Sequence, residues 1–164
     1  MGGPVDDIVQ TLARRGVTVA TAESLTGGLL AARFTELPGS SDIYLGGIVS
    51  YATQVKSSVL EVDSAIIDEH GVVSAECAVE MAEGARRIIG STYALSTTGV
   101  AGPTRQEDKP VGTVFIGLAG PAGSRAIELD LDGERNEIQA ATVEAAVDAL
   151  LASAGRPAED PSVG

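Results

Sequence analysis

The chain has 164 residues, 44% of them apolar, so it has the size of one domain and can bury one sizeable core. Its formal net charge of -12 excludes the overall basic surface with which proteins neutralise the phosphates of a nucleic acid. We therefore expect no nucleic-acid partner. Any anionic ligand must be held by a local group of positive side chains.

Cysteine usage and hydropathy favour a cytoplasmic protein. The single cysteine, Cys77, cannot form an intramolecular disulfide, and no metal motif of paired cysteines exists, which fits a reducing compartment. The N-terminal segment lacks a basic region followed by a continuous apolar stretch. No apolar run approaches the roughly 18 residues of a membrane span. We expect no export and no membrane partner.

Apolar periodicity and turn residues predict the elements of the first half of the chain. In order these are a helix over 5–15, a strand over 17–23, a helix over 26–36, a strand over 42–52 and short helices over 53–60 and 64–70. Inside the second strand, Gly46 and Gly47 indicate a bulge or a close approach of two backbones.

The second half begins with the clearest helix of the chain, 75–89, which Ser74 caps and Gly90 ends. A strand over 92–98 then opens into a loop of glycine, proline and charge that is long enough to suggest function. The remaining predicted elements are a hairpin of strands over 111–119 and 124–131, joined at Gly120 and Pro121, and a helix over 136–152.

Strands that alternate with helices and end in a hairpin are typical of an α/β fold. We predict a three-layer α/β/α sandwich with a mixed, mainly parallel sheet. Residues 1–152 form one domain in this interpretation, and 153–164 form a disordered tail because they carry little apolar surface. Apolar stretches in short, glycine-rich strands favour a homodimer.

Lysine is rare in this chain, which draws attention to Lys56 and Lys109. The chain has these two lysines and nine arginines, so it generally uses arginine for positive charge. An arginine cannot lose its proton in a protein, whereas a partly desolvated lysine can act as a base. The alternative is that both lysines lie on a solvated face.

Ser24 lies in the stretch TAESLTGG, where a strand gives way to a helix. It is either the N-cap of that helix or a nucleophile beside unpaired N–H groups of the helix start, which can stabilise an oxyanion. As a nucleophile it needs a base. Lys56 and Tyr51 are the candidates, since serine–lysine pairs are a known variant of the catalytic triad.

The other residues with possible chemistry have simpler interpretations. The only histidine, His70, ends a predicted helix, where it complements the helix dipole. Cys77 lies on an amphipathic helix and reads as a core thiol. The turn from Thr98 to Pro103 is either a tight turn or a cradle for a ligand. Three cationic side chains could hold a phosphate or could simply be solvated: Arg105, Lys109 and Arg135.

Four stretches together resemble the CinA C-terminal-domain family: TAESLTGG, PGSSDIYLGGIVSYATQVKSSVL, TTGVAGP and KPVGTVFIGLA. The resemblance extends from the first helix to about residue 152, with the motifs in the family's order. Enzymatic members of this family are nicotinamide-nucleotide amidohydrolases. The resemblance implies hydrolysis of the carboxamide of nicotinamide mononucleotide (NMN) to nicotinic acid mononucleotide and ammonia, in pyridine-nucleotide salvage, without a metal or another cofactor.

The family's catalytic residues fall on matching positions of this chain. Its serine nucleophile corresponds to Ser24, its tyrosine to Tyr51 and its lysine to Lys56. Lys56 would take the Ser24 proton directly or through Tyr51. The resemblance also implies an oxyanion site and a substrate site, for which we expect Thr26, Gly27, Gly28, Thr98, Gly99, Ala101, Gly102 and Arg135.

This chain departs from the family pattern at two places. Leu25 follows the serine where many relatives have cysteine, which suggests a packing role for that position. Gln139 and Ala140 follow Arg135 where further arginines are frequent. The chain resembles the family's stand-alone form, without its larger partner domain. The alternative function is a catalytically silent module that binds a nucleotide or serves in competence or damage response.

Overall fold

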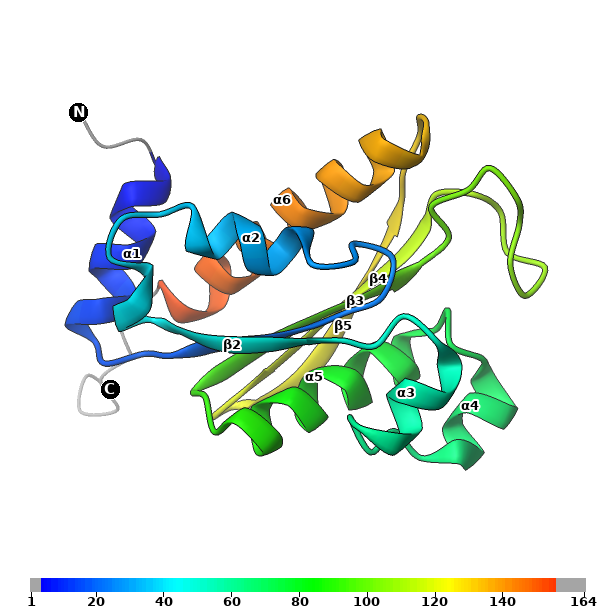
Figure 1. Cartoon of the computed structure of the whole chain (residues 1–164), viewed down its shortest axis with the longest axis horizontal. Helices are drawn as coiled ribbons and strands as arrows, with labels where there is room; N and C mark the ends of the chain where they lie inside the picture. Colours follow the sequence, from blue (N-terminus) through cyan, green and yellow to red (C-terminus); the bar gives the residue numbers. More distant parts are fainter. Residues whose placement is uncertain (1–3, 156–164) are drawn as a thin grey trace, which may run out of the picture.

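The computed structural model describes residues 4–155, and its elements alternate as the sequence predicts (Figure 1). In chain order they are α1 (Pro4–Arg14), β1 (Val19–Glu23), α2 (Leu29–Thr35), the 3-10 helix η1 (Ser40–Asp42), β2 (Tyr44–Val49), α3 (Thr53–Ser58), α4 (Ser64–His70), α5 (Ala75–Ile89), β3 (Tyr93–Gly99), β4 (Thr113–Gly120), β5 (Gly123–Asp130) and α6 (Arg135–Ala154). The last helix thus includes two residues of the predicted tail, of which 156–164 lie outside the described residues.

The strands form one five-stranded sheet in the order β2-β1-β3-β4-β5. β1 pairs in parallel with β2 and β3, whereas β4 runs antiparallel to both β3 and β5. Four strands therefore share one direction and only β4 opposes them. The predicted mixed, mainly parallel sheet is confirmed, and β4 and β5 form the predicted hairpin.

Helices cover both faces of this sheet: α1, α2 and α6 lie on one face, and α3, α4 and α5 on the other (Figure 1). Alternate strand residues face opposite layers, as the twofold periodicity of a strand requires. In β4, Ile116 belongs to the core under α1, α2 and α6, whereas Phe115 belongs to the core under α5. The predicted three-layer sandwich is confirmed. No helix within residues 4–155 has the length and apolar character to cross a membrane.

The predicted ends of α5 are also correct. Ser74 Oγ accepts a hydrogen bond of 3.1 Å from the Cys77 N–H, which satisfies one unpaired donor of the first turn. Gly90 ends the helix with a left-handed φ of 81°, a conformation that costs glycine little. Local sequence rules suffice here because cap and helix are neighbours in the chain.

The glycine pair at 46–47 produces both features expected of it. The register of β1 against β2 shifts after Val19, which makes Leu45 the extra residue of a bulge. A Cβ atom at Gly47 would lie 2.3 Å from Thr21 Oγ1, so only glycine allows β2 to approach β1 this closely. This edge of the sheet leads directly into the candidate site.

Candidate active site

Ser24 and Lys56 meet at the carboxyl end of the parallel strands. Ser24 follows β1, and Lys56 lies in the last turn of the short helix α3. Lys56 Nζ donates a hydrogen bond of 3.0 Å to Ser24 Oγ, although the two residues are 32 positions apart. The fold therefore brings together the serine and the lysine that the sequence singles out.

Lys56 is almost fully buried, with 1% of its surface exposed. Burial lowers the pKa of its ammonium group below the ordinary 10.5, because the charged form loses hydration. Cys77 and Glu107 act in the opposite direction. Burial raises the pKa of the Cys77 thiol to about 11, so this thiol is uncharged near neutral pH and Glu107 alone supplies an opposing charge there. The balance favours a lysine that can lose its proton.

The other two partners of Lys56 Nζ are main-chain carbonyl groups. Ser50 O lies at 2.7 Å and Tyr51 O at 3.3 Å. A carbonyl oxygen accepts hydrogen bonds and never donates one. In the neutral amine, two N–H groups can bond to the carbonyls, which leaves the lone pair for the Ser24 hydroxyl. The arrangement can thus accept a proton from Ser24 directly.

Ser24 is not the N-cap of α2, so that interpretation of the sequence is wrong. The cap position is Gly28, so α2 begins three residues later than predicted, and no side chain caps it. The helix N–H groups of Leu30 and Ala31 instead donate to the Glu23 carboxylate, at 2.7 and 3.2 Å. Because Glu23 satisfies these donors from outside the helix, the Ser24 hydroxyl stays available to Lys56.

The turn 26–28, where we expected oxyanion donors, does not line the cavity beside Ser24. Thr26 is buried and its hydroxyl donates to Glu23 Oε1 at 2.6 Å, while the Gly27 N–H donates to Ser24 O at 3.1 Å. None of the three residues lines the cavity, whereas Leu25 does. Left-handed φ angles at Gly27 and Gly28, 53° and 108°, shape this turn.

A cavity of about 410 Å³ opens beside Ser24 and Lys56. One wall is formed by the end of β3 and the turn after it, which contain the predicted Thr98, Gly99, Ala101 and Gly102. The Thr98 hydroxyl is already used, because it donates to Val72 O at 2.6 Å. Small side chains and a backbone turn leave space for a ligand of the size of a mononucleotide.

Tyr51 and Arg135 also line the cavity. Arg135, the first residue of α6, donates from Nη1 to Gly102 O at 2.6 Å and from Nη2 to the Tyr51 hydroxyl at 3.0 Å. Tyr51 is 62% exposed, and its contact with Lys56 is made by its carbonyl group. The predicted tyrosine thus lies in the site, with its hydroxyl on the arginine.

The other two predicted cations lie differently. Arg105 lines the cavity, and its Nη2 donates to Asp108 O at 2.6 Å. Lys109 does not line it: its Nζ donates to Val73 O and lies 5.9 Å from the centroid of the Phe115 ring. Of the two lysines, only Lys56 has a place in the site.

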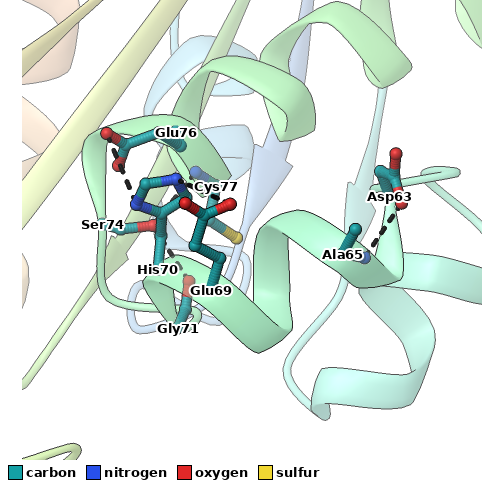
Figure 2. A network of polar contacts seen from close by, with 8 residues as sticks. All are labelled: Asp63, Ala65, Glu69, His70, Gly71, Ser74, Glu76 and Cys77. Atoms are coloured by element: carbon teal, nitrogen blue, oxygen red, sulfur yellow. Dashed lines mark hydrogen bonds and ion pairs between the residues drawn. The ribbon is translucent and has the colours of Figure 1, made fainter.

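His70 and Cys77 have the simpler roles that the sequence suggests. Figure 2 shows His70 at the end of α4, with its ring nitrogens 3.8 Å from carboxylate oxygens of Glu69 and Glu76. Neither His70 nor Cys77 lines the cavity, and Cys77 is fully buried in the core under α5. Within residues 4–155, no group of histidine, cysteine and carboxylate side chains is arranged to hold a metal ion.

Three further residues shape the site without a signal in the sequence. Glu23 anchors the start of α2, and Gln139 Nε2 of α6 donates to Leu25 O at 2.8 Å. The Glu107 carboxylate accepts hydrogen bonds from two N–H groups of the cavity wall, those of Val72 at 3.0 Å and Val73 at 2.8 Å. All three act over long sequence separations, which local patterns do not reveal.

Comparison with known proteins matches residues 4–154 to the model of the CinA C-terminal domain family. A CinA-like protein of Frankia casuarinae is 52% identical over 141 residues, which cover 86% of this chain and 33% of the relative. A CinA-like protein of Geotalea uraniireducens is 46% identical over 151 residues, which cover 91% of this chain and 36% of the relative. The chain therefore spans about a third of the length of these curated relatives.

Solved structures share the fold over almost their whole length. A competence/damage inducible protein of Agrobacterium tumefaciens is 33% identical, with a TM-score of 0.84, and the match covers 95% of this chain and 98% of that one. A CinA superfamily protein of Escherichia coli is 28% identical, with a TM-score of 0.87 and coverage of 90% and 86%.

Proposed function

Because this chain belongs to the CinA C-terminal domain family, we propose that it is an amidohydrolase that converts NMN to nicotinic acid mononucleotide and ammonia in pyridine-nucleotide salvage. One observation carries the proposal: Lys56 Nζ lies 3.0 Å from Ser24 Oγ, buried and bonded otherwise only to main-chain carbonyl groups. A protein that only binds a nucleotide has no need of a buried lysine that costs folding free energy.

The reaction begins with Lys56 as an uncharged amine. It accepts the Ser24 proton while Ser24 Oγ attacks the carboxamide carbon, and the C–N bond then breaks as Lys56 returns this proton to the departing nitrogen. Ammonia leaves and an ester remains on Ser24. Water, deprotonated by Lys56, attacks this ester, and the cleaved Ser24 oxygen recovers the proton. The product is a carboxylic acid, and the enzyme is regenerated.

The remaining side chains of the site would position the nucleotide. Arg135 and Arg105 can pair with a phosphate, and the backbone of the turn 98–102 permits close approach of a ribose. Tyr51 OH bonds to Arg135, so we assign Tyr51 to substrate positioning and the proton transfer to Lys56 alone. The positive pyridinium ring withdraws electrons from the carboxamide and makes its carbon more electrophilic. Leu25, which lines the cavity next to Ser24, offers the N–H for the oxyanion.

The test compares ammonia release from NMN by the wild type, Ser24→Ala and Lys56→Arg, with the product identified by mass. We expect release by the wild type and a loss of about a thousandfold or more in both variants, since the nucleophile and its base act as a unit. Lys56→Arg keeps a long side chain with N–H donors but removes the base, because arginine does not lose its proton. Calorimetry should show that Ser24→Ala still binds NMN.

Two results would contradict the proposal. Normal turnover by a folded Ser24→Ala variant would exclude the covalent route. Binding of NMN without turnover by the folded wild type would instead support the alternative, a silent nucleotide-binding module in competence or damage response. Several structural relatives carry competence or damage in their names.

A further inference from the structure

Glu23 is a buried carboxylate that the proposed chemistry does not use. It is 1% exposed, ends β1 directly before Ser24 and does not line the cavity. A carboxylate at this depth is costly unless donors satisfy it. Three do: the Thr26 hydroxyl at 2.6 Å and the N–H groups of Leu30 and Ala31 at 2.7 and 3.2 Å. Its side chain therefore closes the turn that carries the nucleophile.

The same carboxylate is connected to the neighbouring strand β3. The Thr26 hydroxyl has one proton and donates it to Glu23, so Thr97 is the donor in the 2.8 Å contact between the two threonine hydroxyls. Thr97 also accepts the Ser24 N–H, through its carbonyl oxygen, at 3.0 Å. The Ser24 main chain and the Thr26 side chain are thus both bonded to Thr97 of the central strand, and the Thr26 hydroxyl links Thr97 to the Glu23 carboxylate.

The main chain of Glu23 leads to the base. Its carbonyl oxygen accepts the Ser50 N–H at 2.8 Å, and Ser50 O in turn accepts Lys56 Nζ at 2.7 Å. The side chain of Glu23 fixes the turn of the nucleophile, and its main chain fixes the segment that holds the base. A displacement of Glu23 would change the separation of Ser24 Oγ and Lys56 Nζ from both sides.

We propose that Glu23 is a positioning residue that sets the geometry of the Ser24–Lys56 pair and touches no reacting atom, an inference that rests on the proposed function. The turn itself contains two glycines with left-handed φ angles, Gly27 and Gly28, so it has little stiffness of its own. The buried carboxylate supplies the missing rigidity by bonding to the turn and to the helix after it. Misplacement by about 1 Å can cost on the order of a hundredfold in rate.

The test is Glu23→Gln, which keeps the size of the side chain. Whichever way the amide is turned, its NH2 group faces one of the donors that now bond to the carboxylate. We expect kcat for NMN to fall by about tenfold to a hundredfold, KM to change little and the pH profile to keep its shape, since Glu23 touches neither the substrate nor a reacting atom. Thr26→Val, which removes one donor to the carboxylate, should lower kcat as well. The double variant should lose less than the sum of both, because the two residues act together.

A second measurement is independent of NMN: the rate at which a fluorophosphonate labels Ser24, where Ser24 Oγ displaces fluoride from phosphorus. The rate should fall with Glu23→Gln in parallel with kcat. The matched control is Asp63→Ala, which removes the Asp63 cap of α4, 2.9 Å from the Ala65 N–H and outside the cavity (Figure 2). It should lower the thermal midpoint and leave both rates unchanged.

The possible results test the role of Glu23 and the proposed function separately. Labelling and turnover within twofold of the wild type in folded Glu23→Gln and Thr26→Val, a loss confined to KM, or a shifted pH profile would overturn the role of Glu23. A wild type that is labelled at Ser24 but does not hydrolyse NMN would overturn the proposed function alone, and the labelling rates would still decide the role of Glu23. Absence of both reactions in the wild type would overturn both.

Discussion

Lys56 illustrates, at the scale of one residue, how burial and hydrogen bonding together define a base. Burial lowers the pKa of Lys56, and two carbonyl groups occupy two of its N–H bonds. Below the lowered pKa the lysine is protonated and cannot accept the Ser24 proton. We therefore predict that kcat/KM for NMN rises with pH through this pKa and reaches its plateau below the ordinary lysine value of 10.5.

A pH–rate profile of the wild type measures this directly. Because histidine also titrates near neutral pH, His70→Gln is the matched control, and its profile should coincide with that of the wild type, since His70 does not line the cavity. If the pH at which the rate rises changes in His70→Gln, or if the plateau of the profile begins only at the ordinary lysine pKa, Lys56 is not the base.

At the scale of elements, Gly84 is the position at which helix α5 packs against the segment that carries Lys56. A Cβ atom at this position would lie 2.2 Å from Leu60 O, just after α3. Glycine to alanine normally stabilises a helix interior by about 1 kcal/mol. Here we predict the opposite, a loss of about 1 to 3 kcal/mol from overpacking, together with lower kcat because the backbone near Lys56 must move.

Urea unfolding and NMN turnover of Gly84→Ala test this prediction. Glu83→Ala in the same helix is the control: Glu83 is exposed, so its stability and rate should stay close to those of the wild type. A stabilised Gly84→Ala variant with normal turnover would show that α5 and the Leu60 segment do not need their close contact.

The elements also show which features the sequence could predict. Ser74 and Gly90 were predictable because each cap lies within four residues of the group to which it bonds. The start of α2 was predicted three residues early, because its N–H groups are satisfied by Glu23, seven and eight positions away. No local pattern announces such a contact.

The candidate site has the same limit. The rarity of lysine singled out Lys56, and the need of a serine nucleophile for a base paired it with Ser24, but the bond from Arg135 to Tyr51 joins residues 84 positions apart. From the sequence alone, Tyr51 could serve equally well as a proton relay or as a substrate contact. Lys109 is as rare a residue type as Lys56, yet it does not line the cavity, and its ammonium group bonds to the Val73 carbonyl of the cavity wall.

At the scale of the molecule, β2 is an unprotected edge of the sheet and the place where we expect the homodimer to form. Leu45 and Val49 of this strand are 48% and 50% exposed, and residues 43–55 carry no charge in a chain of net charge -12. Natural edge strands usually carry charges that prevent pairing. The bulge at Leu45 leaves the end of the strand, up to Val49, as the regular part of the edge.

We predict that Val49→Lys produces a monomer, measured by sedimentation. Ile88→Lys is the control, because Ile88 is similarly exposed, at 46%, and belongs to α5 rather than to the edge strand. Association of the wild type should strengthen with salt, which screens the repulsion between two acidic copies. A monomeric wild type, or a Val49→Lys protein of unchanged mass, would exclude this interface.

The contacts of α6 have a consequence for the growing chain on the ribosome. Ser24, Lys56 and the turn after β3 are all synthesised before residue 103, but Arg135 and Gln139, which bond to Gly102 and Leu25, emerge only with α6. The cavity therefore lacks one wall until α6 has been synthesised. A nascent chain can hold the nucleophile and base side by side and still be unable to retain a nucleotide, so premature termination before α6 yields a protein without function.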